Sequence, residues 1–568
     1  MHALIPHRRP LWVATLSLLA LVAAGAVAAQ LPTTPSTALV ALVPLDDRPA
    51  SLQDPVLLGA VADTLVITPP RVVLGRFLKT GDGDAIARWL DGLDLATLDA
   101  VVVSTDMLAY GGLVGSRVAR VFEADARRRV EALARLKQRR PDLRVYAFST
   151  ILRLAPTADG GNDTWREKIA RWAEISPQAA ADPALATETA MIERGLPAGI
   201  LDRYRETRAR NRAINHLLVD LASRGAIDYL IFGQDDPTSR GAHVTDREAI
   251  AEAIDKRKLT GRAAIQANAD ECAMLLLARA LTTRFSYHPA VRAVYSSTAA
   301  RDAVMPFDER PLKDIVAAHI ATAGARLDER GGLQVFVYAS RHQSPDQADA
   351  FASRVAQAVE AGGRVAVADI DTKGAEPGAW LPFTEGLRTR KLLPGLFGYA
   401  SSDTAGNTLG TALTHGLLFA LAVDKVAPAS PVARLRVAQA QVRFLLHRLV
   451  NDFLYQGVVR VQTTDDFVRP RGMNPLRLDE SARSRVEKHL VGELKPLAES
   501  LAADFMRQPW RLPGPSGQRS KVGLTVKDIE GFELTLPWGR MSEVEIQFGL
   551  SAQPVQATPK PPGPRVLQ

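Results

Sequence analysis

Cysteine is almost absent from this 568-residue chain, which contains Cys272 alone. A single thiol excludes an intramolecular disulfide and a zinc site built from several cysteines. Cys272 begins the run Cys-Ala-Met-Leu-Leu-Leu-Ala, whose apolar character is typical of a buried helix. We therefore expect Cys272 to be a core residue and not a nucleophile.

Aromatic residues are also scarce, at 6% of the chain. The formal net charge is +8, but the basic residues are dispersed, as in Arg127–Arg129, and no basic tract carries interleaved aromatic residues. Single-stranded nucleic acids are bound by aromatic stacking within a basic groove. We therefore expect no nucleic-acid partner and interpret the charge as solvated helix faces.

Several motifs that identify cofactor or nucleophile chemistry are missing. The chain has no His-x-His or His-Glu-x-x-His pair, no Walker loop and no Gly-x-Ser-x-Gly elbow. These absences disfavour a zinc site, nucleotide binding and a serine hydrolase of the elbow type. The sequence gives no reason to expect a cofactor.

The N-terminus has the pattern of a signal peptide. Residues 1–29 have no acidic residue, carry Arg8 and Arg9, and continue into the apolar run Leu11–Val22 before the small residues Ala26–Ala29. An uncleaved membrane anchor is the alternative, but the run is short for a bilayer span of about 20 residues. We expect cleavage, a periplasmic or secreted protein, and no membrane span in the mature chain.

Strand-like and helix-like segments alternate along the rest of the chain. Short apolar runs predict strands at 39–45, 64–68, 100–105, 145–151, 229–233, 263–267, 291–296, 335–339, 365–369 and 396–400. These runs are continuous rather than alternating, as expected for strands covered by helices on both faces. Repeated strand–helix units predict an α/β fold with parallel sheets.

Ten strands exceed one eight-stranded barrel, so two architectures remain open. The favoured one has two parallel-sheet lobes, and the alternative is a distorted (β/α) barrel. The predicted divisions are a first lobe at 37–285 with a helical insert at 154–225, a second lobe at 286–425, C-terminal helices and a strand pair at 426–550, and a disordered tail at 551–568.

Polar residues follow strand after strand, at the edge where α/β proteins bind ligands. Each could be a helix cap or a turn residue, but their number favours a site. As catalytic candidates we select Asp47, Asp106, Asp235 and Asp236. As substrate-binding candidates we select Asp46, Arg48, Tyr110, Arg153, Gln234, Asp270, Glu271 and Asn407.

Several long motifs resemble a known bacterial family. They include Pro-Leu-Asp-Asp-Arg-Pro at 44–49, Asp-Met-Leu-Ala-Tyr-Gly-Gly-Leu at 106–113, Gly-Gln-Asp-Asp at 233–236, Ala-Gly-Asn-Thr-Leu-Gly at 405–410 and Leu-Pro-Trp-Gly-Arg at 536–540. The chain resembles the uncharacterised family catalogued as domain of unknown function 4127. The resemblance implies kinship over nearly the whole mature chain but no reaction. One departure is Ser-Ser-Asp at 401–403, where the family pattern implies Gly-Trp-Asn.

Three functions remain open. The leading hypothesis is an exported hydrolase of a glycan or related polar substrate, with Asp235 or Asp236 as the acid and Asp106 or Asp47 as the second carboxylate. The first alternative is a non-catalytic periplasmic binding protein for a polar ligand. The second is a hydrolase whose carboxylates hold Ca²⁺ or Mg²⁺, although no particular residue is identified as a metal ligand.

Overall fold

The computed structural model describes residues 36–235, 237–339, 345–370, 381–401, 404–514 and 519–555. Met1–Ser36 and Thr37–Gln568 are separate units, and the fold described below is that of the second unit. The predicted signal peptide lies outside the described residues and remains a prediction.

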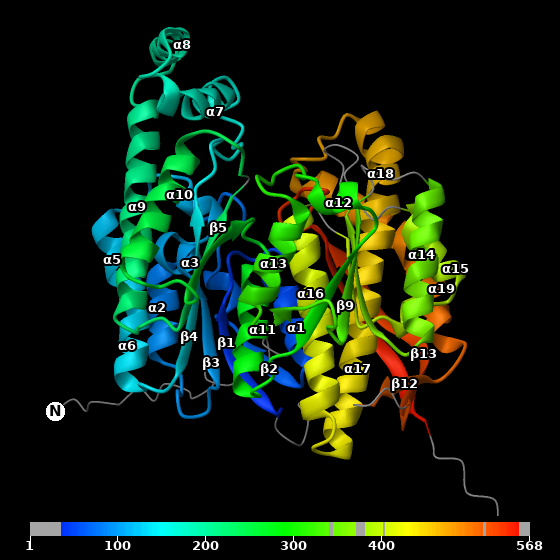
Figure 1. Cartoon of the computed structure of the whole chain (residues 1–568). Helices are drawn as coiled ribbons and strands as arrows, with labels where there is room; N and C mark the ends of the chain where they lie inside the picture. The colour runs from blue at the N-terminus through cyan, green and yellow to red at the C-terminus, as the bar shows by residue number, and fades with distance from the viewer. Residues whose placement is uncertain are drawn as a thin grey trace, which may run out of the picture. The chain divides into compact units, whose positions relative to one another are not determined.

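The first sheet has six parallel strands in the order β2-β1-β3-β4-β5-β6. Their bounds are β1 Ala38–Val43, β2 Thr64–Ile67, β3 Ala100–Ser104, β4 Arg144–Ile151, β5 Tyr229–Gln234 and β6 Ala263–Ala267. Every residue of β3 is buried, because helices cover both faces of the sheet (Figure 1).

The second sheet has five strands in the order β11-β10-β9-β7-β8, and all its pairs are parallel. Their bounds are β7 Ala290–Tyr295, β8 Arg326–Leu327, β9 Leu333–Ala339, β10 Arg364–Ile370 and β11 Gly398–Ala400. The two-lobe prediction is confirmed, and the single distorted barrel is wrong. All ten predicted strands are present; β8 escaped prediction because two residues carry no pattern.

Helix α16 (Ala405–Leu421) packs between the lobes, against α11 (Cys272–Arg284) of the first and β10 of the second. All its residues are buried, and Cys272 is buried as expected. Among the described residues, Ala405–Val426 alone has the length and hydropathy of a membrane span, but 89% of its tested window is buried inside the protein. This segment is therefore packed as a core helix.

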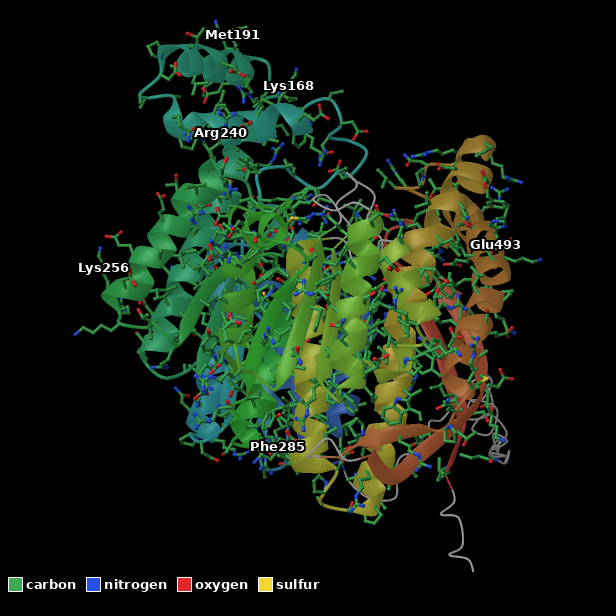
Figure 2. The ribbon with its side chains drawn as sticks, turned by 45° about the vertical axis from the view of Figure 1, so that its right-hand side comes forward. Lys168, Met191, Arg240, Lys256, Phe285 and Glu493 are labelled. Carbon is green, nitrogen blue, oxygen red and sulfur yellow. The ribbon has the colours of Figure 1, made fainter. Side chains whose placement is uncertain are left out.

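The insert after β4 is helical, as predicted, and consists of α7 (Arg166–Ile175), α8 (Pro183–Arg194) and α9 (Ile200–Ser223). Figure 1 shows α7 and α8 standing clear of the sheet. Figure 2 shows Arg240 close to α7, and its guanidinium donates to Glu174 of α7 at 2.6 Å. This ion pair ties α7 to the chain that precedes α10 (Ala242–Lys256).

The C-terminal part begins with α17 (Pro431–Arg448), continues as the π-helical segment η6 (Leu449–Val459) and α18 (Arg460–Thr463), and includes α19 (Glu480–Met506). An antiparallel sheet of β12 (Trp510–Pro513), β13 (Arg519–Thr535) and β14 (Glu545–Pro554) follows. The predicted strand pair is confirmed.

The predicted start of the disordered tail is too early. Residues 551–554 belong to β14 and pair with β13, because the strand outlasts the apolar pattern that ends near Phe548. The rest of that predicted tail, from residue 556 onward, lies outside the described residues.

Candidate functional site

Arg48 joins the loop after β1 to the loop after β6. Its two Nη atoms donate to the two carboxylate oxygens of Asp270 at 2.9 and 2.6 Å, and its Nε donates to Asp46 at 2.9 Å. Burial opposes the charge of Arg48, but the carboxylates of Asp270 and Asp46 raise its pKa well above the ordinary value. Arg48 is therefore a fixed cation at the carboxyl edge of the first sheet.

Trp538, between β13 and β14, is held by Asp47. The indole Nε1 donates to Asp47 Oδ1 at 2.7 Å, and Arg76 Nε donates to Asp47 Oδ2 at 2.7 Å. The guanidinium carbons of Arg48 and Arg540 lie 5.0 and 4.9 Å from the Trp538 ring centroid. Asp47 thus orients the indole, and the indole supports two arginines.

Asp235, directly after β5, forms a bidentate pair with Arg117. The Nε and Nη2 atoms of Arg117 donate to its two oxygens at 2.9 and 2.7 Å, and Nη1 donates to Thr157 Oγ1 at 2.9 Å. Burial alone would raise the pKa of Asp235, but Arg117 and Arg153 lower it below the ordinary value. Asp235 is therefore ionised at neutral pH.

Two glycines form the turn that leads to Arg117. Gly111 ends α3 (Thr105–Tyr110) with φ of +82°, and Gly112 precedes α4 (Leu113–Ser116) with φ of +117°. A Cβ on Gly111 would lie 2.4 Å from the carbonyl oxygen of Gly81. The Tyr-Gly-Gly motif is thus a backbone requirement that places the residue after α4.

Asp106 of α3 is buried beside β4. It accepts hydrogen bonds from the amide and the hydroxyl of Thr150, both at 2.8 Å. Burial is the main cause that raises its pKa to about 6, and the nearby charge of Asp235 adds to the effect. The pKa of Asp106 is therefore raised and that of Asp235 lowered, which is the difference required between the acid and the base of a carboxyl pair.

These elements enclose a cavity of about 540 Å³, here called the arginine cavity. Its described lining includes Asp235, Asp270, Asn407, the aromatic residues Phe77, Phe307 and Trp538, and six arginines: Arg48, Arg117, Arg153, Arg166, Arg460 and Arg540. Arg166 opens α7, so the helical insert contributes to the wall. Both carboxylates on this wall are already paired with arginine.

The structure brings five of the predicted residues to the arginine cavity: Arg48, Arg153, Asp235, Asp270 and Asn407. Six others are buried outside its lining, namely Asp46, Asp47, Asp106, Tyr110, Gln234 and Glu271. Asp236 lies outside the described residues, as do Ser402 and Asp403 of the divergent motif.

Two of the buried residues contact other polar groups. Gln234 Nε2 donates to Glu309 at 2.8 Å, and Glu271 lies 3.4 Å from His319 Nε2. Burial raises the pKa of Glu271 above its ordinary value. Tyr110 is also buried, with the Arg210 guanidinium 4.2 Å from its ring centroid. These side chains support the first lobe rather than face the cavity.

Sequence reasoning missed Arg117, Arg166, Arg460, Arg540 and the three aromatic residues of the lining. The motif Leu-Pro-Trp-Gly-Arg at 536–540 is evident in the sequence, but nothing local connects it to the first strand. Within the described part of the chain, no group of three or more His, Cys, Asp or Glu residues is placed to hold a metal ion.

The comparison with protein families gives one result. The model of a family described as "Protein of unknown function (DUF4127)" matches residues 40–547, and the chain belongs to this family. No curated protein matches the chain.

Proposed function

We propose that this protein binds an anionic polar ligand, namely a carbohydrate that carries carboxylate or phosphate groups, in the arginine cavity. The observation that carries the proposal is the excess of guanidinium groups on the described wall, six against two carboxylates. Arginine presents a planar set of donors that matches carboxylate and phosphate oxygens.

Two of the six arginines also pair with carboxylates outside the lining: Asp46 pairs with Arg48, and Glu543 pairs with Arg540. Arg166 donates through Nε to the Pro156 carbonyl at 2.7 Å, so its positive charge is not neutralised by that bond. A volume of about 540 Å³ accommodates a ligand of one or two sugar rings.

We also propose that the protein is exported, so that it meets this ligand in the periplasm or outside the cell. The pattern of residues 1–29 supports export. A single buried cysteine is compatible with an oxidising compartment, because it has no partner cysteine within the chain.

Calorimetry with the purified mature protein tests the binding proposal. The probes are digalacturonate and neutral lactose, and we expect the anion to bind at least about tenfold tighter, with an affinity that falls as salt rises. Arg166→Ala should weaken digalacturonate binding by about tenfold. The control Arg171→Ala alters the same helix at an arginine that pairs with Glu174 and Glu188 away from the cavity.

Equal affinity for the two sugars would contradict the proposal. Equal losses in Arg166→Ala and Arg171→Ala would place the ligand elsewhere. Binding of digalacturonate that does not change with salt would also contradict an arginine-based site.

Hydrolysis of the bound ligand is the second candidate function, and the raised pKa of Asp106 favours it. In this reaction Asp106, which is buried outside the cavity lining, passes its proton through a bridging water to the leaving glycosidic oxygen. A second water attacks the anomeric carbon, and ionised Asp235 accepts a proton from that second water. The roles are the reverse of those assigned from the sequence.

Asp106→Asn tests this step. We expect this variant to form no product from digalacturonate while its binding stays unchanged. In the unmodified protein the rate of product formation should fall above about pH 6, because Asp106 loses its proton there. Binding without any product at any pH would leave the protein as a binding protein and refute hydrolysis of this substrate.

A further inference from the structure

Backbone conformations that are rare outside glycine occur on the wall of the arginine cavity. Seven described residues other than glycine have a positive φ, and three of these line the cavity: Phe77, Asn268 and Phe307. A positive φ is uncommon for any residue that has a Cβ, and for a side chain as bulky as phenylalanine it is a clear outlier. Strained residues of this kind are typical of ligand-binding sites, because the strain persists only where the surrounding structure holds it.

The two strained phenylalanines differ in what their rings contact. The Phe77 ring, with φ of +47°, has its centroid 5.4 Å from that of Trp538 and 4.9 Å from the guanidinium carbon of Arg540. Phe307, with φ of +61°, is 49% exposed, and within the described part of the chain no aromatic ring or guanidinium group stacks on it. Packing against Trp538 therefore explains the position of Phe77, whereas no such contact explains that of Phe307.

The loop 303–311, which carries this exposed ring, is anchored directly after it. Asn268 Nδ2 donates to Asp308 Oδ1 at 3.3 Å, and Gln234 Nε2 donates to Glu309 at 2.8 Å. Both donors lie at the carboxyl edge of the first sheet, one at the end of β5 and the other directly after β6. A loop of the second lobe is thus fixed on the edge of the first sheet, and these anchors hold the strained residue on the cavity wall.

We propose that the Phe307 ring stacks on the apolar face of a sugar ring of the bound ligand, while the arginines of the cavity hold the anionic groups of that ligand. The inference rests on the proposed function and names the residue that distinguishes a pyranose ring from an open chain of equal charge. The C–H groups on one face of a pyranose ring make that face apolar, and an aromatic ring is a flat apolar partner for it. Covering a ring that is half exposed also removes apolar surface from water.

Calorimetry with two probes of equal charge tests the inference. Digalacturonate carries two carboxylates on two pyranose rings, and glucarate carries two carboxylates on an open chain. We expect the unmodified protein to bind digalacturonate at least about tenfold tighter than glucarate. Phe307→Asn removes the aromatic ring and introduces a residue that tolerates a positive φ, so this preference should fall to about threefold or less. Phe307→Tyr keeps an aromatic ring and should keep the full preference.

Two measurements separate ligand stacking from a structural role of the ring. The affinity of Phe307→Asn for glucarate should change by less than about twofold, because the arginines still hold the anion. Its urea midpoint should equal or exceed that of the unmodified protein, because asparagine adopts a positive φ with less strain. The matched control is Phe122→Asn, which removes a ring that is 81% exposed outside the cavity lining and should keep the full preference.

Each contrary result has a distinct meaning. Equal binding of the two probes by the unmodified protein would overturn the inference and leave the proposed function standing, because both probes are anions. Failure of both probes to bind would overturn both. A full preference in Phe307→Asn would overturn the assignment to Phe307. Equal losses of affinity for both probes, or a lower urea midpoint, would show that the ring supports the fold and would also overturn it.

Discussion

Arg448 is the residue whose replacement tests the electrostatics of the interior most directly. Its side chain is 3% exposed and bonds both Asp54 and Asp452, which are themselves buried. Arg448→Met preserves most of the volume but leaves two carboxylates in the interior without their cation. Removing one partner of a buried ion pair typically costs about 3–5 kcal/mol, and we expect a loss of unfolding free energy in that range at neutral pH.

The pH dependence separates a charge effect from a packing effect. Burial already raises the pKa of Asp452 to about 6, and burial also raises that of Asp54. Without Arg448 both values rise further, so the folded protein binds protons that the unfolded chain releases, and its stability falls as pH rises. The deficit of Arg448→Met should therefore be largest near about pH 7.5 and smaller near about pH 5.

Urea unfolding at the two pH values measures the deficit. Arg469→Met is the matched control, because Arg469 is exposed and pairs with Asp465 at the surface. Its effect should stay below about 1 kcal/mol at both pH values. An Arg448→Met deficit that is equal at both pH values would refute the electrostatic reasoning and point to lost packing.

Three further variants test packing and hydrogen bonding at separate places in the fold. A Cβ at Gly410 would lie 2.6 Å from Glu271 Cβ, so Gly410→Ala should lower the unfolding free energy by about 1–3 kcal/mol, and an unchanged urea midpoint would contradict this close contact. A Cβ at Gly492 in α19 would have no atom within 4 Å, so Gly492→Ala should raise the unfolding free energy by about 0.5–1 kcal/mol. A lower unfolding free energy would show that the added methyl group is crowded. Trp538→Phe removes the donor to Asp47 and should cost about 1–3 kcal/mol by thermal unfolding, whereas no change would show that the indole does not hold Asp47.

The fold could be predicted to the level of its strands. Runs such as Ala100–Ser104 are apolar throughout, and the structure places them in sheets that helices cover on both faces. The count of ten strands left two sheets and a distorted barrel open, and the structure has the two sheets. The end of β14 could not be predicted, because residues 551–552 are half-buried, residues 553–554 are exposed, and this edge segment has no apolar alternation.

The candidate site could be predicted only in part. Strand ends identified Arg48, Asp235 and Asp270, because the carboxyl ends of parallel strands share one edge. The ion pair between Arg117 and Asp235 could not be predicted, because the two residues lie 118 positions apart and no local pattern joins them. The raised pKa of Asp106 could not be predicted either, because its main cause is burial and not the neighbouring sequence.

The hydrogen bond between Asp47 and Trp538 joins residues 491 positions apart. During synthesis, almost the entire chain must leave the ribosome before the indole can reach the loop after β1. The two parallel sheets precede this event in the sequence, so their strands can be paired while the wall of the arginine cavity is still incomplete. A chain that stops before residue 538 would lack both the indole that supports Arg48 and Arg540 itself, so the wall of the arginine cavity would stay incomplete even where both sheets have formed.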